Sequence, residues 1–124
     1  MNVDRASRIL ALIVALLVSA CTAQRTLDYR VKIDPALASF ITVGAVITDQ
    51  QGHLLRVDVQ GENHGVYPVT IGYTIDWYDD AGLRIDTLLS GPRSLDVRPN
   101  GNFTLKGVAP APAAADFRVH LFQG

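Results

Sequence analysis

Apolar and polar side chains alternate along three long segments of the chain, and this alternation restricts the fold more than any other feature. The segments are LLRVDVQG at residues 54–61, VTIGYTIDWY at 69–78 and FRVHLF at 117–122. Successive side chains of a β-strand point to opposite faces of a sheet, so a period of two gives each segment one apolar face. The pattern predicts half-buried strands of an antiparallel sheet.

Residues that favour tight turns separate these segments from one another and from shorter apolar runs. They lie at residues 49–52, 62–65, 79–82 and 99–101, where Gly, Asn and Asp tolerate a positive φ or bond their own backbone. The spacing predicts strands at about 29–33, 41–48, 54–61, 69–78, 83–89, 93–98, 102–107 and 117–123. About seven or eight short strands favour an all-β fold, an antiparallel β-sandwich, with a closed barrel as the alternative.

Two segments depart from the alternation. DPALAS at residues 34–39 is either one helical turn, because aspartate before proline is a fair helix start, or a plain connection. VAPAPAAAD at residues 108–116 contains too much alanine and proline for a strand inside a sheet. It predicts a loop or a short extended crossover.

The first 20 residues have the layout of a signal peptide. Residues 1–8 are polar with two arginines, residues 9–18 are an unbroken apolar run, and two small residues follow. A spanning helix needs about 20 apolar residues, so this run is too short for a lasting transmembrane anchor. The expected parts are a signal peptide helix at 1–20, a cysteine and short tether at 21–28, and a β-sandwich domain at 29–124.

The only cysteine follows the signal peptide directly, and VSAC at residues 18–21 resembles the lipobox of bacterial lipoproteins. The resemblance implies that the Cys21 thiol receives diacylglycerol and that cleavage frees an amino group, which is then acylated. Each buried CH₂ contributes about 0.8 kcal/mol, so several acyl chains would hold the domain firmly on a membrane. Thr22 rather than aspartate comes next, which favours the periplasmic face of the outer membrane. The alternative is a secreted protein with an incidental cysteine.

Charge and cysteine content exclude some partners and cross-links. Cleavage after Ala20 removes Asp4, Arg5 and Arg8, so 9 Lys and Arg remain against 11 Asp and Glu, a net charge of −2. No basic stripe is left to neutralise phosphates, so nucleic acid is not an expected partner. With its one thiol committed to lipid, the domain can form no internal disulfide and must be stabilised by its core.

Three further stretches resemble the YcfL-type family of small predicted periplasmic lipoproteins. They are WYDDAGL at residues 77–83, PRS at 92–94 and the closing strand at 117–122, within a likeness that covers roughly residues 41–123. Each stretch is short, and their order and spacing carry the resemblance. It implies an immunoglobulin-like β-sandwich of undetermined function and assigns no activity.

The alternation places Trp77 and Tyr78 on opposite faces of one strand. Trp77 shares its face with aliphatic residues and is expected to fill the core. Tyr78 then lies outside, and aromatic and arginine side chains are enriched in binding patches. The candidate interaction patch is Tyr78, Asp79, Asp80 and Arg93. A Tyr78 hydroxyl that bonds a nearby loop would give the same pattern.

The densest acidic cluster is Asp76, Asp79, Asp80 and Asp86. Its spacing fails to match a calcium-binding loop, so no metal is predicted. Asp79 and Asp80 are expected instead to open a hairpin turn, with Arg84 or Arg93 as ionic partner.

Nothing in the chain has the pattern of a catalytic centre. No two histidines have the spacing that would place both on one face for zinc. Ser90 or Ser94 can be combined with a histidine and an aspartate only on paper, since no nucleophile-elbow motif surrounds either serine. The sequence therefore predicts no catalytic residue, no metal and no cofactor.

The favoured function is a lipid-anchored, non-catalytic interaction module of the bacterial cell envelope. Its partners would be the membrane, through the lipid on Cys21, and an unidentified envelope protein or cell-wall component that contacts a loop end or a sheet edge. The alternative is an assembly or chaperone factor for an outer-membrane or cell-wall complex. An envelope enzyme is the third hypothesis, and it requires a deep cleft holding His120, Ser94 and an aspartate within hydrogen-bond reach.

Overall fold

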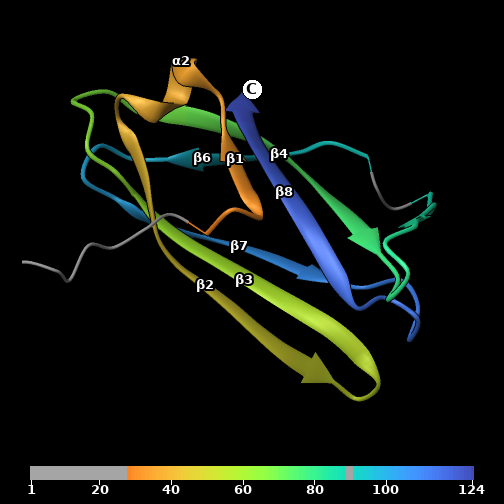
Figure 1. The fold of residues 1–124 in the computed structure, drawn as a ribbon. Helices are drawn as coiled ribbons and strands as arrows, with labels where there is room; N and C mark the ends of the chain where they lie inside the picture. Colours follow the sequence, from red (N-terminus) through yellow and green to blue (C-terminus); the bar gives the residue numbers. More distant parts are fainter. Residues whose placement is uncertain (1–27, 89–90) are drawn as a thin grey trace, which may run out of the picture.

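The structure of the protein, a computed structural model, describes residues 28–88 and 91–124. Within these residues eight strands and one short helix follow one another along the chain (Figure 1). They are β1 Val31–Ile33, α2 Pro35–Ala38, β2 Ile41–Gln51, β3 Leu54–Asn63, β4 Val69–Tyr78, β5 Arg84–Ile85, β6 Arg93–Val97, β7 Asn102–Val108 and β8 Asp116–Gln123. The predicted signal peptide, the lipidation at Cys21 and most of the tether lie outside the described residues and stay predictions.

The strands form two sheets (Figure 1). In the larger sheet the order is β1-β8-β4, and the other edge of β4 pairs with β6 and then with β5. The smaller sheet has the order β2-β3-β7. The described strands thus form a sandwich of two separate sheets, which confirms the predicted β-sandwich and not the alternative barrel.

One strand pair departs from the prediction of an antiparallel sheet. β1 runs parallel to β8, with Val31 opposite Val119 and Ile33 opposite Leu121. Alternation fixes the face that a side chain takes but contains no information on strand direction. A hairpin forces antiparallel pairing, whereas β1 and β8 are joined only through the rest of the domain. Only the tertiary fold sets the direction of this pair.

The predicted strand at residues 83–89 is also much shorter than expected. β5 pairs with β4 only through Arg84 and Ile85, and pairing on this edge resumes with Arg93 in β6. Leu88 is fully exposed because the chain has left the sheet there. The other strands begin and end within a few residues of their predicted bounds, and α2 and the loop before β8 confirm the two irregular segments.

The core lies between the sheets and consists of the inward-facing residues of the alternating segments. Its members on the strands include Ile41, Val57, Val59, Ile71, Trp77, Phe103, Leu105, Phe117, Val119 and Leu121. The rings of Trp77 and Phe117 pack with centroids 6.3 Å apart, and Trp77 is only 5% exposed, which confirms its core role. Each such side chain contributes about 1.5–3 kcal/mol on full burial.

The two sides of the sandwich are closed differently. On one side α2 contacts β8 of the larger sheet and β2 of the smaller one, and its Leu37 is completely buried (Figure 1). On the other side β6 leads through the turn at residues 98–101 into β7, and the two strands then belong to different sheets. The edges of β6 and β7 therefore flank a side that α2 does not cover.

Candidate functional site

The structure separates the four residues of the predicted interaction patch. Tyr73 is directly opposite Arg93 in the β4–β6 ladder, so the two side chains share the inner face of the larger sheet with Trp77. Tyr78 points to the outer face, about 16 Å further along β4 at 3.3 Å per residue. Arg93 is therefore not part of one surface with Tyr78, Asp79 and Asp80.

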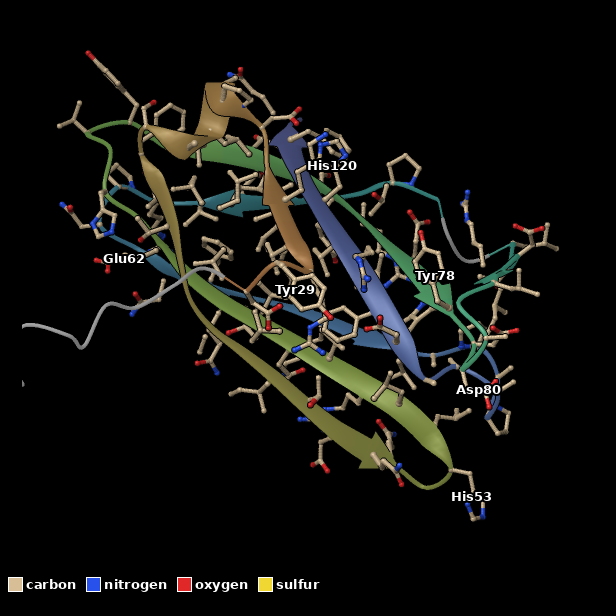
Figure 2. The ribbon with its side chains drawn as sticks, viewed as in Figure 1. Tyr29, His53, Glu62, Tyr78, Asp80 and His120 are labelled. Carbon is tan, nitrogen blue, oxygen red and sulfur yellow. The ribbon has the colours of Figure 1, made fainter. Side chains whose placement is uncertain are left out.

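Tyr78 instead belongs to a cluster on the outer face that includes three residues the sequence did not single out. The guanidinium carbon of Arg118 lies 5.7 Å from the ring centre of Tyr78 and 5.1 Å from that of Tyr29. Arg118 Nη1 also donates to Asp116 Oδ2 at 2.8 Å. Figure 2 shows Tyr29 and Tyr78 on the same face, on either side of β8. We call Tyr29, Tyr78, Asp116 and Arg118 the outer-face cluster.

The charges beside this cluster are paired. For Asp116 partial burial acts to raise the pKa, but hydrogen bonds from Arg118 and the Phe117 amide, together with nearby positive charge, lower the pKa overall. Asp28 forms two side-chain hydrogen bonds with Arg30, at 3.0 and 2.7 Å, and these lower its pKa despite partial burial. Because each cation already has a carboxylate, this surface has its strongest interactions within the chain.

The turn after β4 matches the prediction, although its ionic partner differs. Asp79 Oδ1 accepts hydrogen bonds from the amides of Ala81 and Leu83 at 3.0 and 2.9 Å. Gly82 has a φ of +80°, a conformation that glycine adopts without strain. Arg84 pairs with Asp76 at 3.1 Å and reaches Asp86 at 4.0 Å. The expected pairing of Arg84 with Asp79 or Asp80 is therefore corrected.

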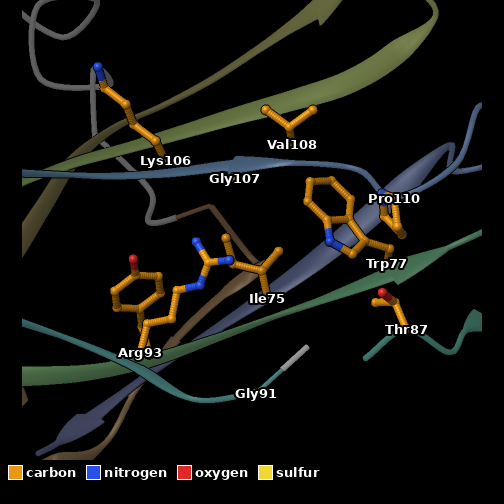
Figure 3. A pocket seen from close by; sticks show the side chains of 10 residues that line it. Ile75, Trp77, Thr87, Gly91, Arg93, Lys106, Gly107, Val108 and Pro110 are labelled. Carbon is orange, nitrogen blue, oxygen red and sulfur yellow. The ribbon is translucent and has the colours of Figure 1, made fainter. Parts of the chain in front are cut away.

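Arg93 lines a small groove on the side of the sandwich that α2 does not cover. We call it the edge groove, and its lining residues are Tyr73, Ile75, Trp77, Thr87, Gly91, Arg93, Lys106, Gly107, Val108 and Pro110. Figure 3 shows the side chains of Ile75, Trp77 and Arg93 in the space between β4 and β7, whereas Lys106 points away from it. The edge groove thus has an apolar floor from the core and one cation inside it.

The volume of the edge groove limits what it can hold. It is about 70 Å³, against roughly 300–1,000 Å³ for pockets that bind small molecules. A cavity needs about 10–15 Å³ to hold a single water, so the groove has room for a few waters or one side chain. Gly107 of β7 lines the groove and packs directly against the end of Ile75: a Cβ there would lie 2.5 Å from Ile75 Cδ1 and 3.4 Å from Trp77 Cζ2.

The electrostatics of the edge groove differ from those of the outer-face cluster. Its only charged lining residues within the described chain are Arg93 and Lys106, both cations. Lys106 lies on the outer face of β7, where it is opposite Asp58 of β3. Arg93 takes part in none of the ion pairs found among the described residues. The groove therefore offers one cation to an incoming group.

The three histidines lie at different places in the fold described by residues 28–88 and 91–124. Figure 2 shows His53 at the tip of the β2–β3 hairpin and His120 near the far end of β8. His64 has two polar neighbours, and both lie nearest its Nε2 atom: Thr42 Oγ1 at 2.7 Å and Glu62 Oε2 at 3.9 Å. In a catalytic triad, by contrast, the two ring nitrogens of the histidine have different partners. No group of three potential metal ligands occurs in this part of the chain.

The serine–histidine combination does not assemble either. His120 Nε2 lies 2.7 Å from Asp34 Oδ1. Ser94 is on β6, however, and β4 separates it from β8, which places the two strands about 10 Å apart at 4.7–4.9 Å per strand. That separation exceeds hydrogen-bond reach. Ser90 lies outside the described residues.

Comparison with known proteins identifies the family of the chain. Residues 29–123 match the family model described as "Protein of unknown function (DUF1425)". The chain belongs to the DUF1425 family. No curated protein matches this DUF1425 member. Among the described residues, no helix combines the length and apolar character needed to cross a membrane.

Two solved structures share the fold of this DUF1425 chain. A DUF1425 family member from Shewanella sp. pv-4 is 18% identical with a TM-score of 0.63, over 68% of this chain and 78% of that one. The structure of Campylobacter jejuni cj0090 is also 18% identical, with a TM-score of 0.66 over 78% of this chain and 100% of that one. At this identity the likeness supports the β-sandwich and assigns no activity.

Sequence reasoning missed the residues that complete both sites. Arg118 follows from the alternation as an outer-face residue, but its position beside Tyr78 depends on β8 pairing with β4. Gly107 gave a weak signal, because a glycine inside a strand often marks a close approach of another chain segment. Nothing local to residues 93 and 107 shows that they line the same groove.

Proposed function

We propose that this DUF1425 protein is a YcfL-like lipoprotein: a non-catalytic interaction module, anchored by lipid on Cys21 at the periplasmic face of the outer membrane. The anchor is supported by the signal-peptide layout, the VSAC sequence and Thr22. Several acyl chains, at about 0.8 kcal/mol for each buried CH₂, are sufficient for stable attachment.

The short tether supports a position close to the lipid. Residues 22–28 separate Cys21 from the folded domain, and seven extended residues reach about 23–25 Å. A domain held at this distance contacts partners at or near the membrane surface. The expected partner is another envelope protein.

The observation that carries the interaction role is the edge groove beside the free edge of β7. A volume of about 70 Å³ matches one side chain rather than a substrate or cofactor. Its lining contains Arg93 and Lys106 but no carboxylate or histidine that could transfer a proton. Such a groove suits recognition of a protein segment better than chemistry.

The anchor is tested by replacing the proposed lipidation site. Cys21→Ser is expected to move the protein from the membrane to the soluble periplasmic fraction, because no acyl chain can then be attached. Thr22→Asp is the matched variant: it retains the cysteine and is expected to shift the protein from the outer to the inner membrane. Intact mass of the membrane-extracted chain should show the acyl chains. Unchanged membrane association of Cys21→Ser would contradict the anchor.

The interaction role is tested in cells with a photo-reactive residue at Val108 or at Tyr78, one for each candidate surface. Ile47 is the matched control for Val108, since it lies on the opposite edge strand of the smaller sheet and is 46% exposed against 44%. A reproducible adduct with the same envelope protein from one surface supports the proposal. Absence of any specific adduct from both surfaces would refute it.

A further inference from the structure

Within the described residues, one edge of β7 has no strand partner and carries unpaired backbone groups at known positions. The amide of Ala109 donates to Leu55 O at 2.8 Å and that of Asn63 donates to Gly101 O at 2.9 Å. Because hydrogen-bonded and non-bonded residues alternate in an antiparallel pair, odd-numbered residues of β7 bond to β3. Lys106 and Val108 therefore direct their N–H and C=O groups away from β3, toward the open side.

The neighbouring edge of the larger sheet is interrupted at the same place. β6 pairs with β4 only as far as Tyr73, and β5 pairs with it only from Trp77 onward. Ile75, between them, has no strand partner on that side among the described residues, and it lines the edge groove. A free strand edge thus lies beside a side-chain-sized space (Figure 3).

We infer that β7 binds an extended segment of a partner protein by strand addition, with an apolar side chain in the edge groove and an acidic side chain facing Arg93. This inference rests on the proposed interaction function and names its site and the chemistry of its ligand. Backbone hydrogen bonds to Lys106 and Val108 would give affinity, and alternate side chains would give specificity.

The position of Gly107 explains where the apolar side chain goes. In an added strand, the residue opposite Gly107 points to the inner face, because cross-strand partners share a face. Gly107 has no side chain, so that residue can reach Ile75 and Trp77. The groove volume of about 70 Å³ accepts one aliphatic side chain.

The positive charge of Arg93 in the groove favours an acidic side chain in the partner segment. Arg93 is exposed, lies on the inner face opposite Tyr73, and forms no ion pair among the described residues. An acidic side chain two positions from the apolar one falls on the same face of the added strand and meets this guanidinium. A second copy of the chain, paired with Gly107 opposite Gly107, would leave the groove empty.

The experiment uses the full chain purified from a bacterial host and a short threonine-rich peptide. Valine, glutamate and valine occupy every second position of the peptide, so that they share one face. Hydrogen exchange followed by NMR is expected to show at least tenfold slower exchange of the Lys106 and Val108 amides with the peptide bound. A matched peptide with lysine in place of glutamate is expected to bind at least tenfold more weakly, and Arg93→Glu should reverse this preference.

Two substitutions on β7 distinguish the contribution of backbone hydrogen bonds to binding from that of side-chain contacts. Val108→Pro removes the N–H that points to the free edge but no bond to β3, so it should abolish binding. Val108→Thr keeps that N–H and the side-chain shape, and should bind as the unmodified chain does. Protection of the Gly107 amide, which points to β3, reports that the variant is folded. If Val108→Pro fails this check, Gly107→Ala should weaken binding at least tenfold, because its methyl group would lie 2.5 Å from Ile75 Cδ1 and force the floor of the groove to shift.

Four results would overturn the inference. They are unchanged exchange of both amides at millimolar peptide, equal binding of the two peptides, peptide-induced changes at Tyr78 and Arg118, and protection that rises with protein concentration when no peptide is present. Cross-linking to an envelope partner only from Tyr78, together with any of these, would remove the strand-addition site. The proposed interaction function would then stand.

Discussion

The outer-face cluster and the edge groove contain similar residue types but differ in whether their arginine has an ionic partner. Each combines tyrosine or tryptophan with arginine, but Arg118 has a carboxylate and two rings as partners, whereas Arg93 has no ionic partner among the described residues. A cation that is already paired gains little from a ligand, while an unpaired one can gain a charge-assisted hydrogen bond. Composition alone would have ranked the two surfaces alike.

The difference also separates stability from recognition. The outer-face cluster holds the start of the domain to β8 through contacts within the chain. The edge groove lies beside an edge of β7 that pairs with no other described strand. Changes in the first region are therefore expected to lower the free energy of unfolding, and changes in the second to alter binding at nearly constant stability.

The largest effect is expected in the core beneath the outer-face cluster. Phe117 is fully buried, packs against Trp77 and lies under the guanidinium of Arg30 at 4.5 Å. Phe117→Ala is expected to lower the free energy of unfolding by about 3–5 kcal/mol, measured by urea denaturation. Phe122→Ala on the outer face of the same strand is the control, and an equal loss there would contradict the assigned core.

The second-largest effect on stability is expected from low pH, which should destabilise the region around the outer-face cluster. The pKa values of Asp28 and Asp116 are both held below their usual value of 3.8. Each carboxylate therefore stabilises the fold at higher pH, and this contribution is lost as the pH falls below about 4 and through the lowered pKa values. The urea midpoint should fall over this range. It should fall less steeply in a variant with both Asp28→Asn and Asp116→Asn, and equal slopes would refute the assignment.

A smaller effect is expected from Arg118 alone. Its side chain is partly exposed, so its ion pair and ring contacts are screened by water. Arg118→Ala should cost about 1 kcal/mol or less in urea denaturation and should leave peptide binding at the edge groove unchanged. A loss of binding would mean that the two surfaces are coupled.

The smallest change in stability is expected at Arg93. Arg93→Ala removes no ion pair found in the described chain, so its free energy of unfolding should stay within about 0.5 kcal/mol. Binding of the glutamate peptide should nevertheless weaken at least tenfold. A destabilisation larger than that of Arg118→Ala would mean that Arg93 supports the fold, and the contrast between the two regions would be lost.

The features that could be predicted from the sequence are those set by interactions between residues close together in the chain. The alternation over residues 69–78 placed Trp77 in the core and Tyr78 outside because successive side chains must take opposite faces. The Asp79 turn followed because an aspartate can bond amides two and four residues ahead. Arg93 was grouped with Tyr78 because aromatic and arginine side chains are enriched in binding patches, and the pairing of Arg93 with Tyr73 shows that residue type does not fix the face.

The sequence by itself determined the all-β class, the residues that face the core and the positions of the turns, because periodicity and turn chemistry act over a few residues. Only the tertiary structure decided that β1 runs parallel to β8, that Arg118 lies beside Tyr78, and that one edge of β7 has no partner strand in the described part of the chain. These outcomes depend on which strands pair, and pairing uses backbone N–H and C=O groups that are the same in almost every residue. The choice of partner is made by the packing of the whole domain.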